Sequence, residues 1–266
     1  GGKEITLNNE LNGITLNGVG NGTEVDYVQV HRNADDGLEI FGGTVNVRHI
    51  LLTNNDDDGL DWDFGWTGKA QFVMIELQYG TEDSNGIEAD NQKSPMDAMP
   101  RSNPIISNVT IVAKGANPRL FNGILLRHGT GGQIHNTIVT GEVAVACVNI
   151  DNEETFKNAG QAVAAGIEQT GLMMVNSIVD CKNGNNFEDK AGDLFKVSEW
   201  FHGANKSANL LVSPLLLGRL PAGNSPALGK GVVPTVAGPW QFEDADYIGA
   251  FSPHADEDWT VGWTAQ

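Results

Sequence analysis

Hydrophobic and polar residues alternate in short segments that follow one recurring four-residue phrase. The phrase begins with Asn or Asp, continues with Gly and an aliphatic residue, and occurs at Asn12–Thr15, Asp36–Glu39, Asp58–Asp61, Asn85–Glu88 and Asn122–Leu125. Its glycines are 22 to 37 residues apart. Period-two alternation predicts a strand with one buried face. A repeat of this length predicts stacked units that bury their apolar faces against their neighbours.

A second set of β-branched segments recurs in step with the first. These segments are Asp26–Val30, His49–Leu52, Phe72–Ile75, Asn108–Val112, Asn136–Val139 and Asn176–Val179. Two repeating strands per unit are typical of one coil of a solenoid. We expect the asparagines at 108, 136 and 176 to stack at one corner, where side-chain amides can hydrogen-bond from coil to coil.

The two patterns predict an all-β chain folded as a right-handed parallel β-helix, a single-stranded solenoid with its coils over residues 1–182. Residues 183–212 are expected to form the last coil and a capping helix, in which Asp193 is the N-cap, Leu194–Phe201 are helical and Gly203 ends the helix. Such a cap would protect the open end of the solenoid from edge-to-edge aggregation.

Three further segments interrupt or follow the coils. A polar, proline-containing loop is expected within 81–104, and the insertion at 151–170 is expected to form a short helix or a lid. The tail at 213–266 is punctuated by proline and glycine, so we expect it to be extended and to pack along the outside of the coils. Its aromatic residues are expected to dock it.

The chain is strongly acidic, with a formal net charge of −18. This excludes nucleic acid as a partner and argues against docking on anionic lipid, because both need a basic surface. No apolar run has membrane-spanning length, so no direct membrane insertion is expected in this segment. The chain opens without a signal peptide, and we expect a mature product that is secreted or held at the outer cell surface.

The two cysteines, Cys147 and Cys181, allow two interpretations. On adjoining coils they would form a disulfide, which suits an exported protein. Alternatively, they are two small buried hydrophobic residues. The sequence leaves both open.

Alternation also assigns side chains to the outer face of the first set of strands. The outward pairs are Thr15/Asn17, Glu39/Phe41, Asp61/Asp63, Glu88/Asp90 and Leu125/Arg127. Because coils stack about 4.8 Å apart, the carboxylates of three consecutive coils should lie close together as one acidic strip, and the turns entering these strands add further acids. The predicted metal ligands are Asp35, Asp36, Glu39, Asp56, Asp57, Asp58, Asp61, Asp63, Glu88 and Asp90.

Like charges at this spacing raise one another's pKa or bind a cation. A donor set of oxygens without His or Cys favours a hard cation, Ca²⁺ before Mg²⁺. The alternative is a solvated acidic face, since Asp is common in turns.

The acidic strip also contains candidates for sugar chemistry. Paired carboxylates can act as acid and base on a glycosidic bond, which makes Asp61, Asp63 and Glu88 candidate catalytic residues. Arg127 would neutralise a uronate or assist a calcium-dependent elimination. The segment Asn55–Asp61 is similar to the Asn-Thr-Asp-Gly-x-Asp phrase of polygalacturonases, and His128-Gly129 to part of their Gly-His-Gly. No Arg-x-Lys follows, and no Gly precedes His128.

A broader resemblance rests on Asp35–Asn46, on Asn55–Asp58 and on Gly65–Gln71. Together with the ending, Tyr247–Phe251 and Asp258–Thr264, these segments resemble a bacterial family of secreted or lipid-anchored β-helix surface proteins of the pectate-lyase-like superfamily. The resemblance implies the fold and an extracellular location, and it carries no settled activity.

Two functions from different classes follow from these observations. The first is an extracellular, calcium-braced module that binds polysaccharide or another cell-surface component through the acidic strip, without catalysis. The second is a polysaccharide lyase or glycoside hydrolase that acts on an acidic polysaccharide at the same face. A cleft flanked by 81–104 and 151–170 would favour the enzyme, and an open face would favour binding.

Overall fold

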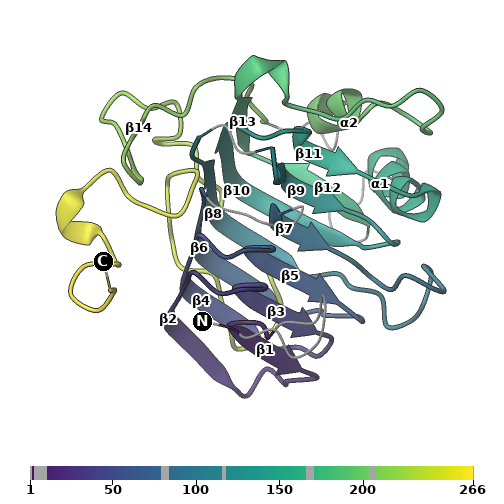
Figure 1. Ribbon diagram of the computed structural model, residues 1–266, viewed down its shortest axis with the longest axis horizontal. Coiled ribbons are helices and arrows are strands. Elements are labelled where there is room, and N and C mark those ends of the chain that lie inside the picture. The colour runs from purple at the N-terminus through teal and green to yellow at the C-terminus, as the bar shows by residue number, and fades with distance from the viewer. Residues whose placement is uncertain are drawn as a thin grey trace.

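The chain forms two parallel β-sheets that face each other across one core (Figure 1). The computed structural model describes residues 2, 11–78, 84–115, 118–165, 171–203 and 208–265. The first sheet contains, in order, β1 (Ile14–Asn17), β3 (Leu38–Phe41), β5 (Leu60–Asp63), β7 (Ser84–Ala89), β9 (Leu120–Leu126) and β11 (Ala146–Ile150). The second contains β2 (Glu24–His31), β4 (Asn46–Thr53), β6 (Lys69–Leu77), β8 (Ile105–Ala113), β10 (Gly132–Gly141) and β12 (Leu172–Val175), and β13 (Ile178–Cys181) also pairs with β10.

Each coil contributes one strand to each sheet, and successive coils stack in sequence order from the purple end to the green end of Figure 1. The predicted parallel β-helix is therefore confirmed. The period-two pattern explains the core, because alternate residues of the first sheet, such as Leu38, Ile40, Leu60 and Trp62, are each at most 1% exposed. In the first coil the inward residues are only partly buried.

Six residues in the left-handed region of backbone space bend the strands of the second sheet at one corner. They occupy equivalent register positions and are Tyr27, His49, Phe72, Asn108, Asn136 and Asn176. The expected asparagine stack is present: Asn176 Nδ2 donates to Asn136 Oδ1 (2.6 Å), and Asn136 Nδ2 donates to Ser107 Oγ (2.8 Å). The sequence pattern did not predict that aromatic rings continue this column, with Tyr27 stacked on His49 and His49 on Phe72.

The phrase glycines lie where neighbouring coils approach closely. A Cβ on Gly37 would lie 2.7 Å from the carbonyl oxygen of Gly59, and one on Gly59 would lie 2.6 Å from that of Gly86. None of the three has a positive φ. Close approach between coils, rather than a special backbone conformation, therefore accounts for these glycines.

Two helices pack at the C-terminal end of the solenoid. Helix α1 (Glu153–Ala165) contacts β12, so the insertion at 151–170 is a helix over its described part, and 166–170 lie outside the described residues. Helix α2 (Val197–Gly203) buries Val197, Trp200 and Phe201 against the main core.

The predicted start of the capping helix was wrong. Helix α2 begins at Val197 rather than at Leu194. Its first turn is capped by Asp189, whose Oδ1 accepts Ser198 N–H (3.0 Å) and whose Oδ2 accepts the Ser198 hydroxyl (2.6 Å). A carboxylate nine residues upstream replaces the local N-cap predicted at Asp193, because the preceding loop folds back onto the helix.

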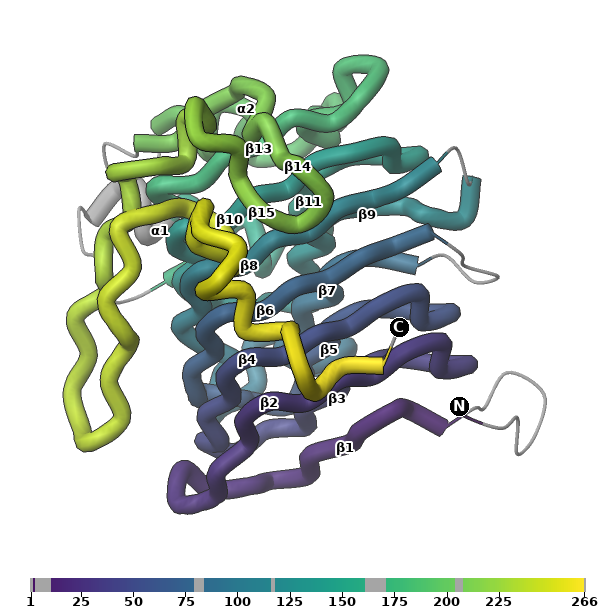
Figure 2. Tube along the Cα trace, turned by 90° about the vertical axis from the view of Figure 1, so that its left-hand side faces the viewer, coloured from purple at the N-terminus to yellow at the C-terminus, as the bar shows by residue number. Residues whose placement is uncertain are grey.

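The tail crosses the outer face of the second sheet and descends over successive coils (Figure 2). Apart from the short β14 (Leu216–Leu217) and β15 (Leu220–Pro221), its described part contains no strand. Side-chain amides at the corner of the second sheet donate hydrogen bonds to backbone carbonyl oxygens of the tail. Asn176 Nδ2 donates to Lys230 O, and Asn108 Nδ2 donates to Tyr247 O. Phe251 is buried in a cluster with Leu51 and Met74 of the second sheet and stacks on Trp259. The tail is therefore extended, and aromatic residues help to dock it on the coils.

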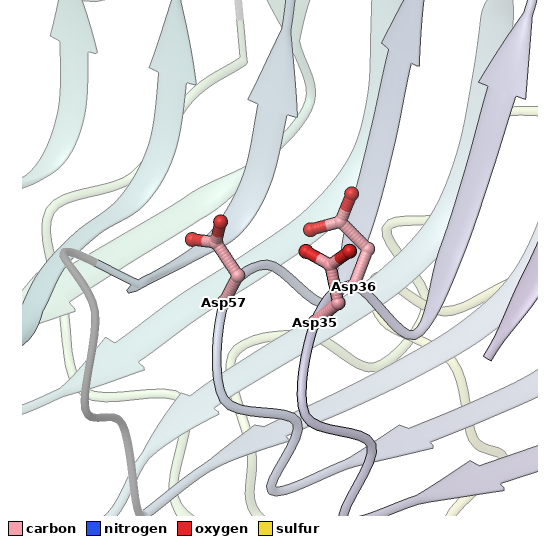
Figure 3. Close-up of side chains that lie close together, drawn as sticks. All are labelled: Asp35, Asp36 and Asp57. Atoms are coloured by element: carbon pink, nitrogen blue, oxygen red, sulfur yellow. The ribbon is translucent and has the colours of Figure 1, made fainter. Parts of the chain in front are cut away.

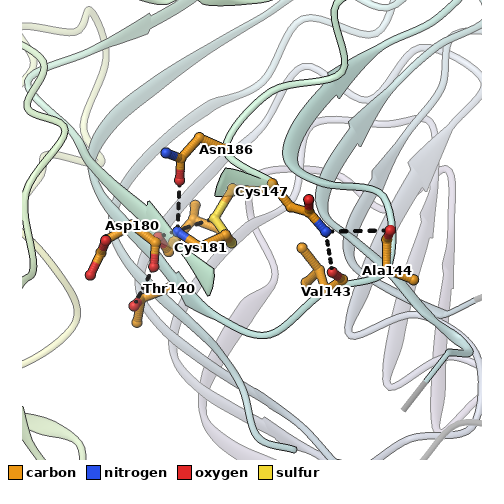
Figure 4. The surroundings of a disulfide bond; sticks show 9 residues. Thr140, Val143, Ala144, Cys147, Asp180, Cys181 and Asn186 are labelled. Carbon is orange, nitrogen blue, oxygen red and sulfur yellow. Dashed lines mark hydrogen bonds between the residues drawn. A yellow bond between two sulfur atoms is a disulfide. The ribbon is translucent and has the colours of Figure 1, made fainter. Parts of the chain in front are cut away.

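A disulfide joins Cys147 on β11 to Cys181 at the end of β13, with the Cα atoms 5.8 Å apart (Figure 4). Cys181 pairs in register with Gly141, and Cys147 follows Gly141 on that earlier coil, so the cysteines occupy adjoining coils as the first interpretation required. Disulfides persist in oxidising compartments. The bond therefore indicates an extracytoplasmic environment. None of the described helices is both long and apolar enough to cross a membrane.

Candidate acidic metal site

The outward side chains of the first sheet form two columns that cross the coils. Strand register places Thr15, Glu39, Asp61, Glu88 and Leu125 in the first column. The second column contains Asn17, Phe41 and Asp63 in register, and continues with Asp90 and Arg127, which directly follow the next two paired strands. The acidic strip is the carboxylate-bearing middle of these columns.

A buried corner runs beside the strip and is formed by the residues that precede the phrase glycines. Asp58 N–H donates to Asp36 Oδ1 (3.0 Å), and both the backbone and side-chain N–H groups of Asn85 donate to Asp58 Oδ1 (2.6 and 3.0 Å). Asn122 Nδ2 then donates to Asn85 Oδ1 (2.8 Å). The signal for this Asn/Asp ladder was the first residue of the recurring phrase, which is Asn or Asp at each occurrence.

Seven of the ten predicted metal ligands fall into three overlapping groups of carboxylates. The oxygens within each group lie within 4.8 Å of one another, and the groups are Asp35/Asp36/Asp57, Asp36/Glu39/Asp61 and Asp58/Asp61/Glu88. Figure 3 shows the first of them, in which two successive turns direct their carboxyl groups toward the same space. Among the described residues, Asp56, Asp63 and Asp90 belong to none of the three groups.

Burial raises the pKa of most carboxyl groups in the strip and its corner, because the charged form loses hydration. The pKa of Glu39 rises to about 7, that of Glu88 to about 8 and that of Asp63 to about 6. Burial, with neighbouring carboxylates adding to it, raises three further pKa values well above the ordinary range, those of Asp36, Asp58 and Asp61. These carboxyl groups therefore stay protonated to unusually high pH, or, when they are ionised, a bound cation must balance their charge.

Arg127 neutralises one end of the strip. Its guanidinium forms ion pairs with Glu88 and with Asp90, the latter at 3.0 Å. Asp90 also binds His128 Nδ1 at 2.6 Å. The strand register would have predicted this cluster, because Arg127 lies one coil beyond both acids. Arg127, which was expected to neutralise a uronate, is thus already paired with two carboxylates of the protein.

The two segments expected to flank the site both contact the corner that follows β9. Asn158 on α1 donates to the carbonyl oxygens of Gly129 (2.8 Å) and Thr130 (3.1 Å). Arg101, in the loop that follows β7, also donates to Gly129 O. Residues 81–83 of the expected loop lie outside the described residues, and β7 occupies 84–89, so the described part of the loop begins at Asp90.

The residues present fit a hard cation. Asp61 belongs to two of the three carboxylate groups, and its Oδ1 is buried without a hydrogen-bond partner. An unsatisfied buried acceptor of this kind is destabilising, and a cation would satisfy it. All donors are carboxylate oxygens, which suit Ca²⁺ or Mg²⁺ better than a transition metal.

Comparison with known proteins gives a family and no characterised relative. The model of a pectate-lyase-like β-helix domain matches residues 1–210, which covers the coils and the capping helix and ends before the tail. No curated protein and no solved structure matches the chain. On the extent of the family match, the chain belongs to the pectate-lyase-like β-helix domain family.

Proposed function

We propose that this protein is a secreted or cell-surface binding module, in which Ca²⁺ held by the acidic strip bridges the protein to an acidic polysaccharide. The observation that carries the proposal is the buried, unpartnered Oδ1 of Asp61 between two groups of three carboxylates. A divalent cation would relieve the repulsion within the strip. It would also offer its remaining coordination positions to the carboxylates of a glycan, which the bare strip would repel.

The pairing of Arg127 supports binding rather than catalysis. Elimination from a uronate requires a cation or base that is free to act on the substrate. Here Arg127 is held between Glu88 and Asp90, with 31% of its side chain exposed. Removing it from these partners would leave two largely buried carboxylates without their counter-charge, which is unfavourable.

A binding experiment tests the proposal directly. The protein is titrated with pectate, alginate and chondroitin sulfate in millimolar calcium and again in EGTA, with heat or fluorescence as readout. We expect saturable binding of at least one polymer in calcium, its loss in EGTA, and its loss in Asp61→Asn. Asp256→Asn, which changes an exposed acid on the tail, serves as the matched control and should bind like the parent. Binding that ignores both calcium and Asp61 would refute the proposal.

The second candidate is a lyase or hydrolase that acts on the same polymers. It is favoured by two carboxyl groups with different raised pKa values, Glu88 at about 8 and Asp63 at about 6, because acid–base catalysis needs groups that remain in opposite protonation states. Unsaturated-uronate absorbance would report elimination, and new reducing ends would report hydrolysis. Turnover that disappears in both Asp61→Asn and Arg127→Ala, with folding intact, would establish the enzyme.

A further inference from the structure

Five coils of the first sheet end in the same left-handed backbone conformation, directly after the second outward column. The residues concerned are Gly18 (φ 62°), Gly42 (φ 64°), Phe64 (φ 49°), His128 (φ 48°) and Asn152 (φ 68°). Glycine adopts this conformation freely, whereas a bulky side chain is strained in it. Phe64 therefore stands where the two preceding coils place glycine.

Burial in the core does not compensate for the backbone strain at Phe64. Its side chain is 53% exposed, and it belongs to none of the hydrophobic core clusters among the described residues. By contrast Phe72, which also has a positive φ, is 5% exposed and stacks on His49. Strained residues that a fold does not need for packing occur preferentially where a ligand binds.

Phe64 is also part of a small apolar surface beside the acidic strip. Its ring lies 5.8 Å from that of Phe41, tilted by 35°, and Phe41 directly precedes Asp63 in the second outward column. The carboxylate of Asp63 accepts the backbone N–H of Phe64 (2.5 Å). Glu39 lies on the same strand as Phe41 and on the same face. Two rings and two carboxylates thus share one end of the strip.

From this arrangement we propose that Phe41 and Phe64 form a stacking subsite for one pyranose ring of the polysaccharide that the strip binds, an inference that rests on the proposed function. A pyranose ring presents an apolar C–H face, which gains from burial against aromatic rings, and a rim of hydroxyl donors, which carboxylates accept. Two rings match one sugar unit in size. They are far smaller than the roughly 800 Å² per partner of a stable protein interface, so a protein partner is disfavoured.

The substitution Phe64→Gly separates a binding role from a structural one. It restores the residue found in the two preceding coils, so it should not lower the melting temperature. It should weaken polysaccharide binding in calcium about tenfold, since one face of the sugar loses an apolar partner. Val261→Ala, at a side chain 72% exposed on the tail, is the matched control and should change neither quantity. Phe64→Trp should retain binding and shift its tryptophan emission on adding polymer.

The possible outcomes distinguish failure of the subsite alone from failure of the proposed function. If the parent binds polysaccharide and Phe64→Gly binds equally well, the subsite is wrong and the proposed function stands. If Phe64→Gly melts at a lower temperature, the ring is structural and the inference fails. If Phe64→Gly instead abolishes self-association in light scattering, the surface is a contact between copies, and the inference again fails. If the parent binds no polymer, both proposals fail together.

Discussion

Raising the pH in the presence of a chelator should destabilise this protein, and calcium should reverse the effect. The reason is the burial of carboxyl groups in the acidic strip and its corner. Glu88, whose side chain is 15% exposed, has a pKa raised to about 8 from an ordinary value of 4.5. A group whose folded-state pKa is raised binds more protons in the folded than in the unfolded chain between these two values. The contribution of Glu88 to stability is therefore fully present below pH 4.5 and is lost as the pH rises through 8.

The expected effect is large enough to measure. For Glu88 alone, the free energy of unfolding should fall by about 3 kcal/mol between pH 5 and pH 8. For a chain of this length that corresponds to a fall in melting temperature of roughly 6–12 °C. A cation bound only by the folded state restores about 2.7 kcal/mol at a hundredfold excess over its Kd. Calcium should thus raise the melting temperature more at pH 8 than at pH 5, where protons compete for the same oxygens.

Thermal melts at pH 5, 6, 7 and 8, each in EGTA and in millimolar calcium, test this reasoning. Asp61→Asn should melt higher than the parent in EGTA at pH 8 and respond less to calcium, because it removes a charge whose Oδ1 has no partner to lose. The exposed Asp256→Asn should behave like the parent. Melting temperatures that are equal at pH 5 and pH 8 in EGTA, and unchanged by calcium, would refute the argument.

Three further predictions concern the solenoid itself. Gly59→Ala should lower stability by about 1–3 kcal/mol by forcing two coils apart, whereas Gly22→Ala, which has open space around it, should melt like the parent; the reverse order would contradict the repeat register. Reducing the Cys147–Cys181 bond, which spans 34 residues, should cost about 3–4 kcal/mol, and equal melts with and without reductant would refute this. Asn136→Ala should lower stability by about 2–4 kcal/mol and speed proteolysis of the tail, since Asn136 holds both a neighbouring coil and the tail; unchanged cleavage would show that the tail docks without it.

Much of the fold could be predicted from the sequence because a solenoid depends on local, repeated signals. Alternation around Leu38 and Leu60 identifies the buried face, and the recurring glycines mark where coils approach. The aromatic column was missed because Tyr27, His49 and Phe72 differ in type, and the register shows that their rings lie one above the next. Packing of one ring on the next replaces the amide hydrogen bonds used in later coils.

The elements that could not be predicted depend on contacts between distant parts of the chain. The start of α2 is fixed by Asp189, which reaches Ser198 only after the intervening loop has folded back. The path of the tail is fixed by side chains on coils more than fifty residues away, such as Asn176 for Lys230. For the candidate site, the outward columns followed from alternation, but the pairing of Arg127 with two acids required the register of β7 and β9.

Stacked coils can be compared with one another position by position, and the acidic corner is the place where this comparison is most informative. Asn12, Asn85 and Asn122 occupy the phrase position that Asp36 and Asp58 hold in the two coils between them. An asparagine would supply the same acceptor oxygen for the ladder hydrogen bonds without a charge. Aspartate at 3% and 6% exposure is therefore a costly choice for structure alone. This cost is offset if the carboxyl groups hold a proton or share a cation. Among the described residues, asparagine is replaced by aspartate at this position only in coils that contribute to the three carboxylate groups. The same comparison sets Phe64 apart from the glycines that the two preceding coils place at the edge of the same strip. Two independent departures from the repeat thus converge on one face of the first sheet, and this convergence is the reason to place a cation-dependent binding function there.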